Sequence, residues 1–293
     1  MILITGASGK TGQAVTRSIL GKGEKVRVFL HRPEQVSRMQ SIGVHDAIAG
    51  DMRDRNAMDR ALNGVRAVYH ICSAVNPDES AIGREVIAAA LSAGVDHFVY
   101  HSVLHPQLEA LPHHRQKLRV EEHLIESGMQ YTVMQPAIYM QKVLEFWERI
   151  VQQGVYAAPY GIRAHLSMVD LEDVAEAASI VLTEPGHGAA TYELCGVEAL
   201  SAVEMAITLG QLLGRTVRAE DLPLDLWEAR VRSSGLGDYQ VKTLSAMFRH
   251  YAENGFLGNP NVLTWLLHRL PTGFAAFVER TMRQQTPTDK EHQ

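Results

Sequence analysis

The first half of the chain alternates short apolar runs with longer stretches in which apolar residues recur at helical spacing. Six runs are rich in β-branched and aromatic residues and predict buried strands: 2–4, 26–29, 47–49, 67–71, 97–100 and 131–134. The segments between them are long enough for crossover helices, as at 13–20, 82–92 and 115–126. Strands that alternate with helices in this way predict a parallel sheet covered by helices on both faces.

The pattern changes after Pro136. Segments 166–169 and 192–194 are expected to be strands and 174–182 a helix, so the sheet should resume there. Segment 139–152 and most of the chain from Ser201 onward predict helices, with one candidate strand at 216–218. We therefore expect an α/β fold in which a Rossmann-type doubly wound parallel sheet is followed by a smaller, mainly helical C-terminal substrate domain. The expected boundaries are 1–136 and 164–196 for the sheet domain, 137–163 and 197–283 for the smaller domain, and 284–293 for a flexible tail.

The loop after the first strand has the sequence ITGASGKTG and suggests two kinds of phosphate site. A Walker A loop needs a glycine five residues before the glycine of Gly-Lys-Thr, but Ile4 occupies that position. Glycines 6, 9 and 12 instead have the spacing of a strand-to-helix turn whose backbone N–H groups approach a dinucleotide pyrophosphate. We expect Gly6, Ser8, Gly9, Lys10, Thr11 and Gly12 to bind that coenzyme.

The end of the second strand indicates which nicotinamide coenzyme is preferred. A fold that prefers NAD places a carboxylate about twenty residues after the glycines, on the ribose 2′-hydroxyl. Arg32 stands twenty positions after Gly12, and no carboxylate precedes it in this segment. A guanidinium there can hold a 2′-phosphate with two hydrogen bonds, so NADP(H) is favoured over the alternative that Arg32 is only a surface residue.

Composition excludes several other functions. The chain has 293 residues, of which 46% are hydrophobic and 21% charged, and a formal net charge of −5. Its 28 lysines and arginines form no run that would suit nucleic acid or an anionic membrane. The two cysteines, Cys72 and Cys195, are too few for a disulfide framework. Because residues 1–5 indicate a buried strand and not a basic leader, we expect a cytoplasmic protein.

Several motifs together resemble the NmrA-like branch of the atypical short-chain dehydrogenases/reductases. They are residues 5–12, Gly50-Asp51, Lys117 with Glu121 ahead of 131–136, Val169-Asp170-Leu171-Glu172-Asp173-Val174-Ala175, and 266–271 followed by 273–278. The likeness spans nearly the whole chain and includes relatives similar to NADPH quinone reductases and triphenylmethane-dye reductases.

The resemblance implies positions for further coenzyme contacts. Asp51 would meet the adenine, residues Cys72, Ser73 and Ala74 would line the adenosine side, and Pro136 with Ala137 would lie beside the nicotinamide. Each position also has a structural interpretation, since Asp51 can cap the following turn and Cys72 can be a small buried apolar residue.

The chain departs from the usual catalytic pattern of the superfamily, a serine followed by Tyr-x-x-x-Lys. Ser102 closes the fifth strand on the coenzyme side and Lys117 lies on the next helix, but His113 stands where the tyrosine is expected. One hypothesis is an NADPH-dependent reductase that passes hydride to a quinone-like or other conjugated small molecule, with Lys117 on the nicotinamide ribose and His113 as proton donor. The alternative is a non-catalytic NADP(H)-binding redox sensor that acts through a protein partner. A sugar-nucleotide epimerase is disfavoured because the tyrosine is missing.

Two further features bear on the site. The five histidines between His101 and His123 lack the spacing of a zinc site, so no metal is predicted. Segment 138–141, with Phe146 and Trp147, could form the wall of an acceptor pocket or could equally be core. Tyr139 is the member with a polar tip and is the second candidate proton donor.

Overall fold

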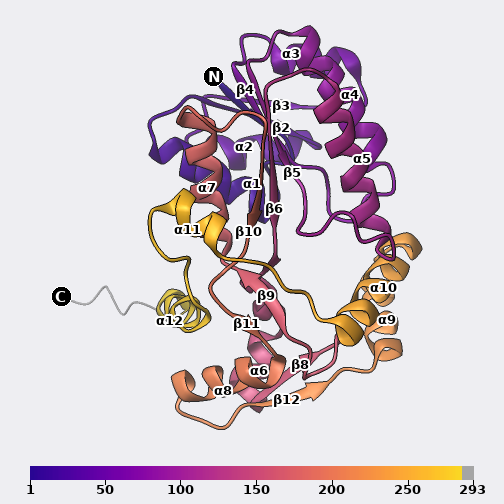
Figure 1. Cartoon of the computed structure of the whole chain (residues 1–293), viewed down its shortest axis with the longest axis vertical. Coiled ribbons are helices and arrows are strands. Elements are labelled where there is room, and N and C mark those ends of the chain that lie inside the picture. Colours follow the sequence, from indigo (N-terminus) through magenta and orange to yellow (C-terminus); the bar gives the residue numbers. More distant parts are fainter. Residues whose placement is uncertain (286–293) are drawn as a thin grey trace, which may run out of the picture.

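The computed structural model describes residues 1–285, which are built around a seven-stranded parallel sheet (Figure 1). Its strands lie in the order β10-β6-β5-β4-β1-β2-β3. Their bounds are β1 Ile2–Ile4, β2 Val26–Leu30, β3 Asp46–Ala49, β4 Ala67–His70, β5 His97–His101, β6 Tyr131–Pro136 and β10 Ala190–Leu194. The predicted Rossmann-type doubly wound sheet is therefore confirmed, with strand boundaries within a few residues of those expected.

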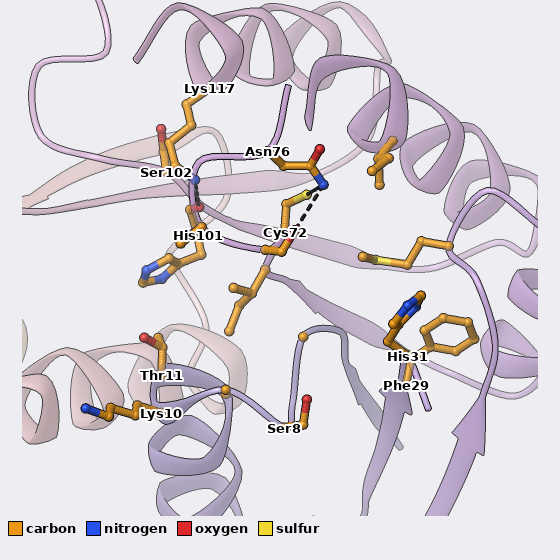
Figure 2. Close-up of a pocket in the computed structure, with 18 of the residues that line it drawn as sticks. Ser8, Lys10, Thr11, Phe29, His31, Cys72, Asn76, His101, Ser102 and Lys117 are labelled. Atoms are coloured by element: carbon orange, nitrogen blue, oxygen red, sulfur yellow. Dashed lines mark hydrogen bonds between the residues drawn. The ribbon is translucent and has the colours of Figure 1, made fainter. Parts of the chain in front are cut away.

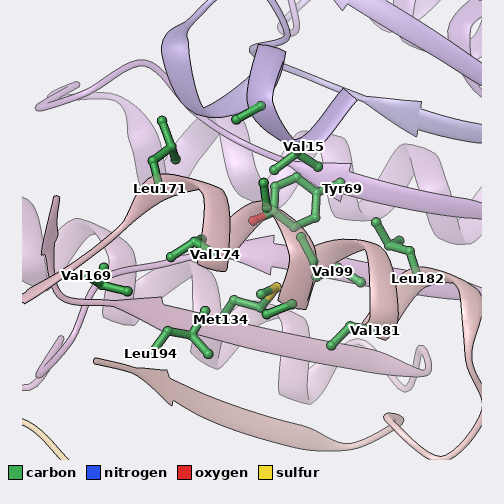
Figure 3. Packing of buried hydrophobic residues seen from close by; sticks show 14 of the residues in the cluster. Val15, Tyr69, Val99, Met134, Val169, Leu171, Val174, Val181, Leu182 and Leu194 are labelled. Carbon is green, nitrogen blue, oxygen red and sulfur yellow. The ribbon is translucent and has the colours of Figure 1, made fainter. Parts of the chain in front are cut away.

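Helices cover both faces of this sheet because successive strand residues point in opposite directions. Ile2 and Ile4 pack toward α1 (Lys10–Gly21) and α7 (Leu171–Thr183), whereas Leu3 between them packs into the core on the other face. That second face carries α3 (Arg55–Leu62), α4 (Glu79–Ser92) and α5 (Pro112–Glu126). Figure 3 shows the first core, where α7 packs over Tyr69, Val99 and Met134. A short α2 (Val36–Gln40) follows one 3₁₀ turn at Pro33–Gln35.

A smaller unit lies beyond the carboxyl ends of the strands (Figure 1). It contains a three-stranded sheet in the order β11-β9-β7 and a parallel pair, β8 with β12. These strands are β7 Ile138–Tyr139, β8 Val155–Ala158, β9 Leu166–Val169, β11 Ala199–Leu200 and β12 Arg218–Asp221. The remaining helices are α6 Trp147–Gln153, α8 Ala202–Leu213, α9 Leu224–Ser233, α10 Asp238–Asn254, α11 Asn261–Leu267 and α12 Phe274–Gln285.

Two segments differ from the sequence expectation. Residues 166–169 do form a strand, but β9 pairs with β7 and β11, so the large sheet resumes only at β10. Residues 139–152 are not one helix, because they continue from β7 into a 3₁₀ segment at Met140–Phe146 and then α6. The expected tail falls almost entirely outside the described residues.

The strand order reverses direction between β1 and β4, and this reversal positions the functional site. The connection after β1 leads through α1 to β2 on one side, whereas β4 starts the half of the sheet on the other side. The loops after the two strands therefore separate and leave a crevice at the carboxyl edge, the usual ligand position in open α/β sheets. No helix within residues 1–285 is long and apolar enough to cross a membrane.

Candidate active site

A cavity of about 760 Å³ opens in this crevice (Figure 2). Its wall is built from the loops that follow β1, β2, β3 and β4, from the ends of β5 and β6, and from α5. The predicted site residues in this wall are Gly6, Ser8, Gly9, Lys10, Thr11, Gly12, Asp51, Cys72, Ser73, Ala74, Ser102, Lys117, Pro136 and Tyr139. Arg32 and His113 do not line it.

The three glycines of the first loop differ in the space available for a Cβ atom. Gly6 has a φ of +60°, and a Cβ there would lie 2.7 Å from the Ile71 carbonyl oxygen. A Cβ on Gly12 would lie 2.5 Å from the Gly6 carbonyl oxygen, so both glycines are needed to close the turn. A Cβ on Gly9 would meet nothing nearer than 3.4 Å. Gly9 therefore has room in the folded chain, and the space beside it at the start of α1 suits a pyrophosphate.

The adenosine end of the cavity is formed after β2, β3 and β4. Asp51 accepts a hydrogen bond from the Arg53 backbone N–H and forms an ion pair with the Arg53 guanidinium, both at 2.9 Å. These hydrogen bonds lower the pKa of the Asp51 carboxyl. Asp51 thus caps its turn while it lines the cavity, so the two interpretations are compatible. Burial raises the pKa of the Cys72 thiol to about 11, which keeps this thiol protonated and unreactive.

A second hollow of about 420 Å³ shares Ser8 with the main cavity. Arg32 and Arg38 both line it. Gln13 connects the two regions, since it donates to the Ser8 carbonyl at 2.7 Å and accepts from Arg38 at 3.4 Å. Within residues 1–285 neither arginine forms an ion pair, so both guanidinium charges are available to an anion beside Ser8. Arg38 was not predicted from sequence, because its position depends on the turn after β2.

Lys117 and Ser102 lie on the wall of the main cavity opposite the glycine loop (Figure 2). Lys117 Nζ donates to the buried Glu79 carboxylate at 2.7 Å and to the His101 carbonyl at 3.1 Å. Glu79 also accepts from the Tyr100 hydroxyl at 2.9 Å. The Ser102 hydroxyl donates to Glu121, so its proton is not directed at a ligand. The ammonium group of Lys117 retains one N–H for a ribose hydroxyl at the cavity surface.

Tyr139 is connected to the buried His101, which the sequence singled out only as a member of a histidine cluster without zinc-site spacing. Its hydroxyl lies 2.8 Å from His101 Nε2, and His101 Nδ1 lies 2.7 Å from the Tyr69 hydroxyl. Burial, with a smaller contribution from Lys117, lowers the pKa of His101 to about 3, so this imidazole is neutral. Burial raises the pKa of Tyr139 above its usual range, and a hydrogen bond with Thr11 opposes that shift. The position of His101 at the end of β5 is the one sequence signal that could have indicated it.

His113 does not line the cavity although it lies in the first turn of α5. It is buried, its ring contacts that of His114 edge-on with 4.4 Å between the ring centroids, and burial lowers its pKa to about 3. Its Nδ1 has no hydrogen-bond partner within the described residues. A neutral imidazole outside the cavity is poorly placed to protonate a ligand, whereas Tyr139, the second candidate, lines the cavity.

The expected acceptor wall is only partly in the cavity. Of its expected members Tyr139 lines the cavity, but Met140, Phe146 and Trp147 pack into the core of the smaller unit with Tyr156. The core interpretation therefore holds for those three residues. Among residues 1–285 no group of three His, Cys, Asp or Glu side chains is arranged to hold a metal ion.

The strand order and the glycine loop at the reversal point define a dinucleotide-binding protein of the Rossmann type. A model of the NmrA-like family matches residues 1–285, and the chain belongs to that family. A (4-alkanoyl-5-oxo-2,5-dihydrofuran-3-yl)methyl phosphate reductase of Streptomyces griseus subsp. griseus is 36% identical over 77% of this chain and 78% of its own length. An NAD(P)H azoreductase of Xenophilus azovorans is 30% identical over 92% of each chain.

A solved structure extends this likeness. The NADPH-dependent quinone oxidoreductase of Escherichia coli, complexed with NADPH, has a TM-score of 0.84 and 26% identity, and the match covers 96% of this chain and 100% of that chain. The resemblance seen in the sequence motifs is thus confirmed at the level of the family and the fold.

Proposed function

We propose that this protein reduces a quinone-like or other conjugated small molecule with hydride from NADPH. The observation that supports the proposal most is the single cavity that runs from the glycine loop to Tyr139 and Lys117. A coenzyme lying along it would place its nicotinamide between these side chains, with space open to an acceptor. The chain is an NAD(P)H-dependent oxidoreductase by its family and its named relatives, and the identity of the acceptor is the part proposed here.

The described residues fit the coenzyme along its length. The start of α1 and the open space at Gly9 would hold the pyrophosphate, and Arg32 with Arg38 would hold a 2′-phosphate beside Ser8. Lys117 would donate to the ribose next to the nicotinamide, near Pro136. NADPH, when bound, supplies the hydride, and the chain's own residues orient it and exclude water.

Three kinds of relative support a conjugated acceptor. The Streptomyces relative is named for a ring whose double bond is conjugated with carbonyl groups, the Xenophilus relative for azo compounds and the Escherichia relative for quinones. Each acceptor can take a hydride at an electron-poor conjugated position. We propose Tyr139 as the donor of the proton that a quinone oxygen then needs, because its hydroxyl is at the cavity.

The cavity also favours the reductase over a sensor without catalysis. A sensor does not need an open space next to the nicotinamide, whereas here Ala137, Tyr139 and Lys117 all line the cavity at that end. The two cysteines are free and buried, which suits a reducing compartment, and we propose the cytoplasm as the location.

Oxidation of NADPH measured with a panel of acceptors tests the proposal. The panel contains a benzoquinone, an azo dye, a triphenylmethane dye and a conjugated lactone, with a saturated ketone as control. We expect turnover with one or more conjugated acceptors and none with the ketone. Tight binding of NADPH without turnover of any acceptor would instead support the redox sensor.

A further inference from the structure

A chain of three side chains crosses from the cavity into the core: Tyr139, His101 and Tyr69. Tyr139 comes from β7, His101 from the end of β5 and Tyr69 from β4, so parallel strand pairing and the turn after β6 bring them together. The Tyr139 hydroxyl contacts His101 Nε2 at 2.8 Å, and the Tyr69 hydroxyl contacts His101 Nδ1 at 2.7 Å. Tyr139 and His101 both line the cavity, whereas Tyr69 is 0% exposed and lies behind them in the core.

The number of donors and acceptors determines which group donates in each of these two hydrogen bonds. A neutral imidazole has one N–H donor and one bare nitrogen acceptor. Within residues 1–285 the Tyr69 hydroxyl has no hydrogen-bond partner besides His101 Nδ1. A buried O–H without an acceptor is costly, so Tyr69 must donate to Nδ1. His101 then carries its proton on Nε2 and donates it to the oxygen of Tyr139.

The consequence for Tyr139 is that its oxygen accepts from His101. A hydrogen bond with Thr11 lowers the pKa of Tyr139, as a hydroxyl that donates to the phenol oxygen does, so Thr11 also donates to this oxygen. Because both partners donate to the oxygen, the O–H of Tyr139 is left for a ligand in the cavity. A hydrogen bond received at the oxygen becomes stronger when that oxygen turns into a phenolate, so it favours loss of the proton. The neutral state of His101, kept by burial and by Lys117, prevents the imidazole from giving its own proton to a ligand.

We propose that His101, held in its Nε2–H tautomer by Tyr69, is a positioning residue that makes Tyr139 the proton donor to the reduced acceptor. This inference rests on the proposed function. In the step, a quinone takes hydride at the conjugated system and the electron pair moves onto a carbonyl oxygen. The Tyr139 O–H bond breaks as the new O–H bond of the product forms, while NADPH is oxidised to NADP⁺.

The same geometry indicates how Tyr139 recovers its proton. The series of hydrogen-bonded side chains ends at Tyr69, and burial raises the pKa of Tyr69 well above its usual range. A proton therefore cannot be drawn from the core without leaving a buried phenolate. Water entering the cavity must therefore reprotonate Tyr139. His101 holds and orients Tyr139 but does not relay protons.

The first test is nitrogen NMR of the histidine side chains in the coenzyme-free protein. Loss of one set of signals in the His101→Gln variant assigns His101 in the wild type. We expect a protonated Nε2 and a bare Nδ1 near neutral pH. A protonated Nδ1 would overturn the inference. The NMR measurement does not depend on catalytic activity.

The second test compares two acceptors. A quinone needs a proton after hydride transfer, whereas a cationic triphenylmethane dye becomes neutral on accepting hydride and needs none. The His101→Phe variant should lower kcat for the quinone by about tenfold to a hundredfold, without a comparable change for the dye or in NADPH affinity. The His101→Gln variant places an amide N–H near the position of Nε2 and should recover much of the quinone rate.

The outcomes separate this inference from the proposed function. Equal losses of kcat for both acceptors in His101→Phe would mean a structural role and would overturn the inference while the reductase stands. If the wild type reduces no acceptor at all, the proposed function fails, and the role of His101 in protonation fails with it.

Discussion

Lys117 donates a 2.7 Å hydrogen bond to Glu79, a carboxylate that is only 1% exposed on a different helix. The Lys117 side chain is itself 13% exposed, and its Nζ also lies 5.4 Å from the centre of the Tyr100 ring. Its charge is therefore balanced before any ligand enters the cavity. Lys117 acts at the site as a fixed hydrogen-bond donor and less as an attractor of anions.

Removal of Glu79 should therefore be costly for stability. Glu79→Ala leaves the Lys117 charge in a largely buried position and removes the acceptor of the Tyr100 hydroxyl. We expect the free energy of unfolding to fall by about 3–5 kcal/mol, measured by chemical denaturation. The matched control is Glu145→Ala, which breaks an exposed pair with Lys142 and should cost less than about 1 kcal/mol. Similar losses for the two variants would contradict this account of Lys117.

Substitutions at two glycines of the first loop should have different effects, one on the stability of the fold and the other on coenzyme binding. Gly12→Ala forces a methyl group against the Gly6 carbonyl oxygen and should destabilise the fold by about 1–3 kcal/mol. Gly9→Ala has space in the folded chain and should change stability by about 0.5 kcal/mol or less. Its methyl group would occupy the space of the pyrophosphate, so calorimetry should show NADPH affinity at least about tenfold weaker. Unchanged affinity in Gly9→Ala would place the pyrophosphate elsewhere.

Arg32 and Arg38 should select the coenzyme. Each side chain can donate charge-assisted hydrogen bonds to a 2′-phosphate, which NADH lacks. Arg32→Ala and Arg38→Ala should each weaken NADPH binding by about tenfold to a hundredfold and leave NADH binding nearly unchanged. The exposed Arg60 on α3 provides a control, since Arg60→Ala should affect neither coenzyme. Equal losses of affinity for NADPH and NADH would contradict the assignment of Arg32 and Arg38 to the 2′-phosphate.

Tyr139→Phe should reduce catalysis without reducing coenzyme binding. The variant keeps the ring but loses the O–H that the proposal assigns to protonation of a quinone oxygen. Steady-state rates with a quinone should fall by about a hundredfold or more. The dissociation constant of NADPH, followed by fluorescence, should stay the same. An unchanged quinone rate would mean that water or another group supplies the proton.

Buried histidines predict loss of stability in acid. Burial lowers the pKa of His70, His101 and His113 to about 3, and of His97 and His114 to about 4. Below about pH 6.5 the unfolded chain binds protons at these residues and the native state does not, so stability falls as pH falls. Each histidine contributes a slope of about 1.4 kcal/mol per pH unit between that pH and its native pKa.

Denaturation curves recorded from pH 7 to pH 4 measure this slope. We expect a marked decline that begins below about pH 6.5. A free energy of unfolding that stays constant across this range would show that these histidines are protonated in the native state.

The parts of the fold that could be predicted are those set by local pattern. Runs such as 26–29 and 131–134 are β-branched and short, and the helical spacing between them is regular, so the sheet followed from sequence. The glycine spacing likewise located the cavity. Strand 166–169 was recognised as a strand, but its partners β7 and β11 are very short and gave no pattern that would assign it to a second sheet.

The parts of the site that could not be predicted depend on contacts between distant residues. Glu79 and Lys117 are 38 positions apart, and His101 meets partners 32 and 38 positions away. Phe146 and Trp147 have a spacing that suits a pocket and a core equally, and packing alone decides for the core.

A single-turnover experiment tests the reductase most directly. Protein loaded with stoichiometric NADPH is mixed with excess quinone, and the nicotinamide absorbance is followed by stopped flow. We expect one NADPH per chain to be oxidised in a single phase, faster than in the absence of protein. Bound NADPH that persists in the presence of the quinone and of every other conjugated acceptor in the panel would contradict it.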